Sequence, residues 1–227
     1  MTALAGDRLF SGRRPPALFL DFDNTIASCD VLDRVIERYS ATDRWCRWET
    51  DWQRGRISTR ECLERQIADL RVTPAELIAF TDEFAIDEAF APLLSWAAAN
   101  AIETAIVSDN FALIVAAMLE RRGLPAVRIY ANRLDFDGDR PRASFPLRDP
   151  RCERCAHCKA QHLRRVTDRL RVFAGDGLSD ICPALAAEVA FAKDSLAAHL
   201  RATGRPYRPF RTLTDVLQFL QNAPSHV

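Results

Sequence analysis

The fold is decided by one short stretch, Ala17-Leu18-Phe19-Leu20-Asp21-Phe22-Asp23-Asn24-Thr25. An apolar run that ends in polar residues is typical of a buried strand in a parallel sheet, and such sheets bind ligands at the carboxyl ends of their strands. Side chains alternate along a strand, so Asp21 and Asp23 would point to one side and Phe22 into the packing. Taken alone, the pair indicates a polar turn more than a site.

A second acidic pair follows another apolar stretch, Arg171-Val172-Phe173-Ala174-Gly175-Asp176-Gly177-Leu178-Ser179-Asp180. This stretch predicts a strand that ends at Asp176, a glycine-rich turn, and a helix from Leu178 to Glu188 that contains Asp180. Four carboxylates at one sheet edge, with no histidine in either motif, favour a hard ion such as Mg²⁺, which completes its shell with water and substrate phosphate. The two pairs together indicate phosphoryl chemistry.

Two further polar residues lie between the acidic pairs. Residues 102–107 predict a strand that ends at Ser108, just before a helix predicted over 111–119. Ser108 could therefore help to hold phosphate at a helix N-terminus, and an ordinary helix cap explains it equally well. Only two of the 31 basic residues are lysines, Lys159 and Lys193. The choice of lysine indicates a need for a compact charge at Lys159, with a surface lysine kept by chance as the alternative.

The order of these motifs, Asp-x-Asp-x-Thr, Ser after a strand, Lys, and Gly-Asp-Gly-x-Ser-Asp, resembles the haloacid dehalogenase superfamily of phosphotransferases over roughly residues 17–195. The resemblance implies that Asp21 is the nucleophile, which forms an aspartyl-phosphate, and that Asp23 is the general acid and base. The implied Mg²⁺ site consists of Asp21, Asp176 and the backbone carbonyl of Asp23. Asp180 would support the ion through water or orient Lys159. The implied phosphate-binding positions are Ser108, Asp109 and Lys159.

Two positions refine this resemblance. The dehalogenase branch of the superfamily lacks the second aspartate, so Asp23 favours phosphate monoesters over haloacids as substrates. Asp109 departs from the common pattern, because many relatives carry glycine after the Ser or Thr. It brings an extra carboxylate close to the expected phosphate, which leaves the phosphate contacts at this position open.

Strand and helix signals alternate after residue 87, which predicts an α/β protein with a Rossmann-like, doubly wound parallel sheet. Residues 30–86 carry helix signals only, among them the capping box Thr73-Pro74-Ala75-Glu76. They predict a small helical cap inserted after the first strand, as in the phosphoserine phosphatase-like branch of the superfamily. The predicted divisions are an N-terminal leader at 1–16, the α/β core at 17–29 and 87–227, and the cap at 30–86.

Two smaller features complete the layout. Trp45, Trp48 and Trp52 share one helical face, which predicts the cap's own core more than a ligand-stacking surface. The dipeptide Asp137-Gly138 predicts the turn of a β-hairpin.

The composition of the 227 residues bounds the function. A formal net charge of zero argues against a partner such as nucleic acid or a membrane surface. No stretch is long enough to cross a membrane, and residues 1–16 lack the apolar segment of an export signal. Seven cysteines without such a signal favour the reducing cytoplasm. The sequence leaves a monomer and a homodimer equally open.

Three of these cysteines approach Lys159 with regular spacing, and they are Cys152, Cys155 and Cys158. Thiols at this spacing can meet on one structural Zn²⁺, and plain reduced cysteines explain them equally well. The candidates for a fourth zinc ligand are His157, His162 and Cys29.

The cysteine-rich approach to Lys159, together with Asp30, resembles the methionine-salvage branch of the superfamily, which acts on an enol/keto phosphate. Phosphoserine phosphatases carry a glutamate at the position of Asp30, so the shorter side chain weakens a phosphoserine assignment. The sequence therefore predicts a Mg²⁺-dependent phosphatase of a small phosphorylated metabolite, with the methionine-salvage phosphate leading and Asp30 setting specificity. The alternatives are a phosphatase of phosphoserine or another amino-alcohol phosphate, and a non-catalytic zinc- or redox-sensing protein, against which the intact acidic motifs argue.

Overall fold

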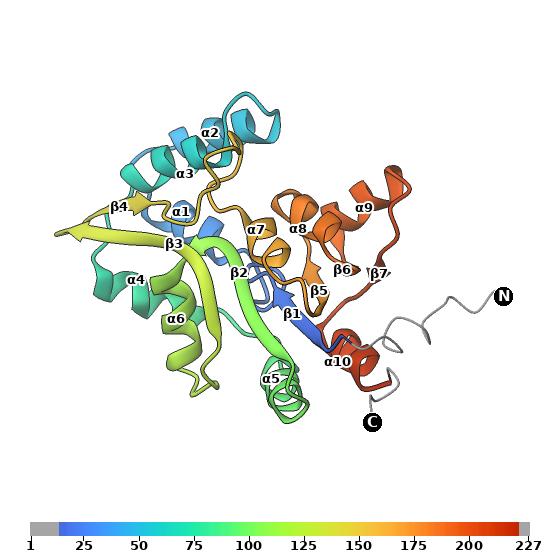
Figure 1. The fold of residues 1–227 in the computed structure, drawn as a ribbon. Coiled ribbons are helices and arrows are strands. Elements are labelled where there is room, and N and C mark those ends of the chain that lie inside the picture. Colours follow the sequence, from blue (N-terminus) through green and yellow to red (C-terminus); the bar gives the residue numbers. More distant parts are fainter. Residues whose placement is uncertain (1–13, 223–227) are drawn as a thin grey trace.

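The computed structural model describes residues 14–222, and one sheet runs through this part of the chain (Figure 1). Its seven strands lie in the order β4-β3-β2-β1-β5-β6-β7, and neighbouring strands are parallel except for β3 and β4. The strands are β1 Pro16–Leu20, β2 Glu103–Phe111, β3 Arg128–Asp137, β4 Arg140–Ser144, β5 Leu170–Gly175, β6 Val189–Ala192 and β7 Arg208–Pro209. The predicted α/β class with a doubly wound sheet is confirmed.

Strand β1 lies in the middle of the sheet, between β2 and β5, and all five of its residues are buried. Leu18 and Leu20 belong to one hydrophobic cluster, whereas Ala17 and Phe19 belong to a second. A strand that is buried on both faces consists of a continuous apolar run, which is the pattern in the sequence. Because β1 ends at Leu20, Asp21 emerges at the carboxyl edge of the sheet.

Helices cover both faces of the sheet. Buried residues of α5 (Phe90–Ala99), α6 (Ala112–Glu120) and α10 (Leu213–Asn222) join the larger cluster. Those of α7 (Lys159–Arg164), α8 (Ile181–Ala186) and α9 (Asp194–Ala202) join the smaller one.

The helix predicted over residues 178–188 is broken. A 3₁₀ turn, η2 (Leu178–Asp180), precedes α8, and β6 begins only three residues after α8 ends. The cause is the Asp180 carboxylate, which turns back to accept hydrogen bonds from the backbone N–H groups of Asp176 and Gly177. These bonds keep the end of β5 and the start of α8 in a tight turn.

Residues 30–86 are helical, as predicted. They form α1 (Val31–Tyr39), α2 (Arg44–Gln53), α3 (Thr59–Ala68), α4 (Pro74–Phe80) and the 3₁₀ turn η1 (Thr81–Glu83). Capping boxes begin α3 at Ser58 and α4 at Thr73. α4 and η1 pack against α6, and buried residues of α1 and α3 join the larger cluster of the core. The division into cap and core therefore stays a prediction, and residues 1–13 of the predicted leader lie outside the described residues, while Pro16 already opens β1.

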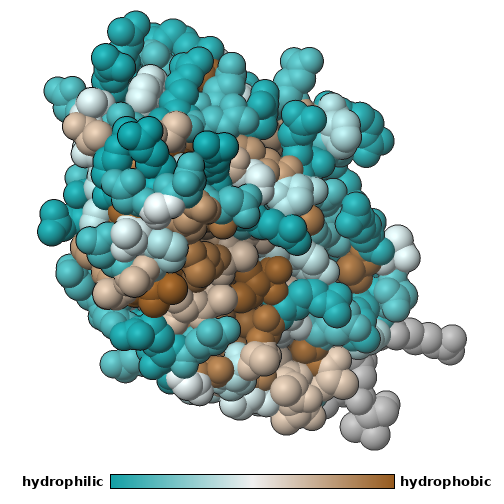
Figure 2. All heavy atoms as spheres, turned by 90° about the vertical axis from the view of Figure 1, so that its left-hand side faces the viewer, coloured by the Kyte–Doolittle hydropathy of each residue, from teal (hydrophilic) through white to brown (hydrophobic). Residues whose placement is uncertain are grey.

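The surface agrees with this packing. α2, all of which lies within the described residues, has no fully buried side chain. Figure 2 shows a mostly hydrophilic surface at the height of α2 and α3, and hydrophobic side chains gathered lower, at the height of α4 and α6. The helices nearest the carboxyl edge of the sheet are therefore held mainly from one side.

The predicted hairpin is confirmed. β3 and β4 pair in antiparallel fashion around Gly138, whose φ of 63° is in the left-handed region that glycine favours. Within residues 14–222, no helix is both long and apolar enough to cross a membrane.

We expect Phe22→Ala to lower the free energy of unfolding by about 3–5 kcal/mol, because the ring is fully buried and its loss leaves a cavity. Leu185→Ala is the control, since Leu185 is 49% exposed and its truncation should cost less than about 0.5 kcal/mol. Urea unfolding of both variants measures the difference. Equal losses of stability in the two variants would show that the Phe22 ring does not anchor the segment that carries Asp21 and Asp23.

Candidate active site

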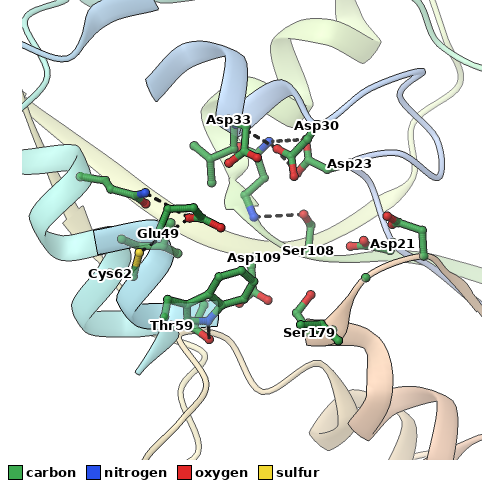
Figure 3. Close-up of a pocket in the computed structure, with 18 of the residues that line it drawn as sticks. Asp21, Asp23, Asp30, Asp33, Glu49, Thr59, Cys62, Ser108, Asp109 and Ser179 are labelled. Atoms are coloured by element: carbon green, nitrogen blue, oxygen red, sulfur yellow. Dashed lines mark hydrogen bonds between the residues drawn. The ribbon is translucent and has the colours of Figure 1, made fainter. Parts of the chain in front are cut away.

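A cavity of about 150 Å³ lies at the carboxyl ends of β1, β2 and β5, between the sheet and the helices α1, α2 and α3 (Figure 3). On the sheet side its lining includes Asp21, Asp23, Ser108, Asp109, Lys159 and Asp176. On the helical side it includes Asp30. Residues that the sequence predicted as one site, and that are up to 155 positions apart, therefore share one cavity.

Lys159 is at the centre of the charged groups. Its side chain is buried at the start of α7, and Nζ lies 2.7 Å from Asp21 Oδ1 and 2.8 Å from Asp180 Oδ1. Nζ also donates to Ser179 Oγ at 3.1 Å and lies 3.9 Å from Asp109 Oδ2. Burial alone would lower the pKa of Lys159, but the charges of Asp180 and Asp21 raise it well above its ordinary value. The ammonium group therefore stays charged inside the protein.

Three carboxylates converge beside this lysine. One oxygen each of Asp21, Asp176 and Asp180 lies within 4.8 Å of the other two. Burial, and then the charge of Asp180, raises the pKa of Asp21 well above its usual range and that of Asp176 to about 7. Three carboxylates therefore share one buried ammonium group, that of Lys159. A site of hard oxygen donors with excess negative charge fits a divalent ion such as Mg²⁺.

Asp180 can approach this group only because residue 175 is glycine. A Cβ on Gly175 would lie 2.5 Å from Asp180 Oδ2 and 2.9 Å from the Phe173 ring. Both distances are shorter than any ordinary contact. The glycine that follows the apolar strand in the sequence therefore makes room for the buried carboxylate.

Asp23 is oriented by a residue that sequence reasoning missed. The amide Nδ2 of Asn110 donates to both carboxylate oxygens of Asp23, at 3.1 and 3.0 Å, and the backbone N–H of Val31 donates to Oδ1 at 2.9 Å. Burial, and then the charge of Asp30, raises the pKa of Asp23 well above its usual range. The signal in the sequence is that Asn110 is the third of three consecutive polar residues after the apolar run, behind Ser108 and Asp109.

The surroundings of Ser108 correct one prediction. β2 continues to Phe111, with an irregular register after Val107, and α6 begins only at Ala112. Ser108 is thus neither at a helix N-terminus nor a helix cap. Its buried hydroxyl accepts the backbone N–H of Asn110 at 3.0 Å, a bond within the irregular end of the strand.

Asp109 connects the strand end to the segment before Lys159. Its Oδ1 accepts the backbone N–H of His157 at 3.1 Å. The His157 ring in turn lies 2.8 Å from the carbonyl oxygen of Ser108 through Nδ1, and 2.8 Å from His162 Nε2 through its own Nε2. These contacts fix the segment that delivers Lys159.

The predicted zinc site lies in the same segment, before Lys159. Within residues 14–222, the acidic triad is the one group of three or more His, Cys, Asp or Glu ligands close enough to share an ion. Zinc binding by Cys152, Cys155 and Cys158 stays a prediction. Cys152 and Cys155 hydrogen-bond to each other, while Cys158 is buried at the start of α7. The seven cysteines, all within the described residues, are free thiols.

The wall opposite the sheet comes from α1, α2 and α3. Asp30 caps α1, because its side chain accepts the backbone N–H of Asp33 at 2.9 Å. Trp52 lines the cavity and donates its indole N–H to Thr59 Oγ1 at 2.9 Å. The prediction that the tryptophans form the cap's own core is wrong for Trp52, because helical spacing indicates a shared face but not what that face contacts.

The comparisons with known proteins agree with this geometry. A family model described as haloacid dehalogenase-like hydrolase matches residues 18–184, and the chain belongs to this family. A relative from Geobacillus kaustophilus, named 2-hydroxy-3-keto-5-methylthiopentenyl-1-phosphate phosphatase, is 30% identical over 210 residues, which cover 90% of this chain and 94% of the relative. A relative of the same name from Brevibacillus brevis is 27% identical over 220 residues, which cover 92% of this chain and 97% of the relative.

Solved structures show the same fold. One, described as a phospho-aspartyl intermediate analogue of phosphoserine phosphatase, has a TM-score of 0.69 at 16% identity and covers 91% of this chain and 99% of its own. A hydrolase of the same family from Salmonella enterica has a TM-score of 0.73 at 16% identity and covers 92% of this chain and 72% of its own. The predicted family, fold and enzyme class, a hydrolase of the phosphatase type, are thereby confirmed.

We expect the His157–His162 pair to make stability depend on pH. Burial lowers the pKa of His157 to about 4 and that of His162 to about 3, while an unfolded histidine titrates near about 6.5. Below about pH 6.5 the unfolded chain therefore binds protons that the folded chain does not, and the free energy of unfolding falls as the pH falls towards about 4.

Urea unfolding at about pH 7 and about pH 5 measures this loss. His162→Gln removes one of the two groups, so its stability should fall less over this range than that of the parent chain. His199→Gln, in α9 and outside the pair, is the control. A pH dependence that is the same in all three proteins would contradict the assignment.

Proposed function

We propose that this chain is a Mg²⁺-dependent phosphomonoester phosphatase that works through an aspartyl-phosphate on Asp21, with the methionine-salvage enol/keto phosphate as the leading substrate. The observation that carries the proposal is the contact of Lys159 Nζ with both Asp21 and the fully buried Asp180, beside a cavity that Lys159, Asp21 and Asp23 line. This set supplies a nucleophile, a fixed cation and a second carboxylate around one space.

Asp21 is the proposed nucleophile. A carboxylate is a weak nucleophile, and it can attack a phosphoryl group only where positive charge offsets the charge of the phosphoryl oxygens. Lys159 provides one such charge, at 2.7 Å from Asp21. The residues that would hold Mg²⁺ are Asp21, Asp176 and, directly or through water, Asp180, together with the backbone carbonyl of Asp23; when bound, the ion supplies further positive charge to the phosphoryl oxygens.

Asp23 is the proposed general acid and base. Its raised pKa keeps a proton on the carboxyl group at higher pH than usual, so that it can protonate the leaving alcohol and later accept a proton from the attacking water. The two bonds from Asn110 hold the carboxyl group in one orientation. Ser108, Asp109 and Lys159 are the proposed neighbours of the phosphoryl group, with Asp109 acting through the segment that it fixes.

The choice of substrate rests on the relatives. Two chains that align over about nine-tenths of this one carry the name of the methionine-salvage phosphatase, which supports that phosphate as the leading candidate. Asp30 lines the cavity and is the proposed specificity residue. We keep a cytoplasmic location as part of this proposal.

We expect Asp21→Asn and Asp23→Asn to fail in different ways. Asp21→Asn should lose activity on both alkyl and aryl phosphates, since no phosphoenzyme can form. Asp23→Asn should lose about 10²–10⁴-fold in kcat/KM on an alkyl phosphate and less on p-nitrophenyl phosphate, whose leaving group needs no proton.

Steady-state kinetics with added Mg²⁺ measure both effects, and excess EDTA should abolish the activity of the parent chain. Equal losses on both substrates for Asp23→Asn would remove it as the general acid. Full turnover after confirmed removal of the metal would refute the Mg²⁺ requirement.

A further inference from the structure

A second cavity, beside the segment that leads to Lys159, is rich in thiols. Its volume is about 480 Å³, and four of the seven cysteines line it, which are Cys152, Cys155, Cys158 and Cys182. The first three are the regularly spaced cysteines of the sequence. Cys182 comes from the start of α8, which packs beside α7 (Figure 1). These four residues form a thiol cluster, to which the fold adds a member that sequence spacing does not indicate.

The fourth metal ligands that the sequence left open lie elsewhere. His157, His162 and Cys29, all among the described residues, do not line this cavity. Both ring nitrogens of His157 already face partners at 2.8 Å, one of them on His162. The His162 ring also stacks on Tyr130, with the ring centroids 3.9 Å apart. Cys182 is therefore the candidate that the structure brings to the other three thiols.

The charges around the thiol cluster suit a metal ion held by sulfur. Arg151, Lys159 and Arg164 line the same cavity, and Asp149 is the one acidic side chain among its described lining residues. A divalent ion bound by four thiolates carries a net negative charge, which nearby cations stabilise. Four cysteine ligands, with pairs separated by two residues, are a donor set of structural zinc sites, and soft thiolates select Zn²⁺ over Mg²⁺.

The segment that carries three of these thiols touches several parts of the active site. Residues 145–158 contain no helix or strand. The carbonyl oxygen of Arg154 accepts the backbone N–H of Thr59, at the start of α3, at 2.9 Å. The backbone N–H of His157 donates to Asp109, and the segment ends where α7 begins. A metal ion bound here would therefore fix an irregular segment that contacts both the sheet edge and the helices above it.

We propose that the thiol cluster binds one structural Zn²⁺, with Cys182 as the fourth ligand. The ion joins the segment before Lys159 to the start of α8. Because α7 begins with Lys159 and α8 follows Asp180, the ion fixes the two elements that bring this ion pair together. It takes no part in the reaction, so the inference stands apart from the proposed phosphatase function.

Binding requires the thiol cluster to close around the ion. No three of its sulfur atoms, all of them in described residues, lie within 4.8 Å of one another, whereas zinc ligands lie about 2.3 Å from the ion. Cys158 and Cys182, at the starts of two packed helices, provide the fixed half of the site. Cys152 and Cys155 already hydrogen-bond to each other, and their segment can move without breaking a helix or strand.

Metal analysis tests the site directly. The full chain is reduced, stripped of metal with a chelator, dialysed against Zn²⁺ together with Mg²⁺, and desalted. We expect it to retain about one zinc per chain, as a single four-ligand site requires. Co²⁺ in place of Zn²⁺ should give the near-ultraviolet absorption of a thiolate-bound ion, which a site made of Asp21 and Asp176 cannot produce.

Variants identify the fourth ligand. Cys182 is exposed, so Cys182→Ser should fold as the parent chain does and yet bind Zn²⁺ at least about tenfold more weakly, because losing even an outer partner of a metal ligand costs about 10–100-fold in affinity. It should also weaken the thiolate absorption of the Co²⁺ form. Cys46→Ser is the matched control, because Cys46 is exposed as well and lies in α2, away from the thiol cluster.

Hydrogen exchange shows whether the ion fixes the segment. Zn²⁺ should slow the exchange of the backbone N–H groups of residues 150–159 and of Thr59, which donates to Arg154. This protection should appear in the parent chain and in Cys46→Ser, and it should be lost in Cys182→Ser.

Three results would overturn the inference. A reduced parent chain that retains no zinc refutes the site. A Co²⁺ form without thiolate absorption shows that the ion binds elsewhere, for example at the carboxylates. Equal Zn²⁺ affinity and equal protection in Cys182→Ser and the parent chain remove Cys182 as a ligand.

Discussion

The structure of the site depends on one buried ammonium group. Lys159 Nζ contacts Asp21 and Asp180 at 2.7 and 2.8 Å, and the three side chains come from different elements of the fold. A buried charge is tolerated only when it is paired, so these contacts require the end of β1, the turn after β5 and the start of α7 to meet. The segment before Lys159 is fixed in turn by Asp109 and the two paired histidines.

Asp180 connects the Lys159 contact to Asp176, one of the proposed Mg²⁺ ligands. One of its oxygens faces Lys159 and the other accepts the backbone N–H groups of Asp176 and Gly177. The Asp180 carboxylate therefore positions both the Lys159 ammonium group and the turn that presents Asp176. Gly175 leaves room for this carboxylate.

The sequence predicts those features of the structure that depend on local patterns. The apolar run before Asp21, the turn after Gly175 and the capping boxes each follow from short-range rules, so the sheet, the acidic pairs and the helices at 30–86 could be anticipated. Contacts between distant residues could not. The bond from Asn110 to Asp23 joins positions 87 apart, and neither the cavity-facing ring of Trp52 nor the extension of β2 through Ser108 leaves a periodic signal. Local pattern also does not decide between a zinc site and reduced thiols at Cys152, Cys155 and Cys158.

The most direct test of the central contact is the stability of Lys159→Met, measured by urea unfolding in EDTA at about pH 8 and about pH 5. Removing the cation leaves buried carboxylates unpaired, so the loss at about pH 8 should reach about 3–5 kcal/mol. The raised pKa values of Asp21 and Asp176 then let these two groups take up protons as the pH falls, so the loss should shrink at about pH 5. Lys193→Met is the matched control. A Lys159→Met protein as stable as the parent chain at about pH 8, or a loss independent of pH, would contradict the account.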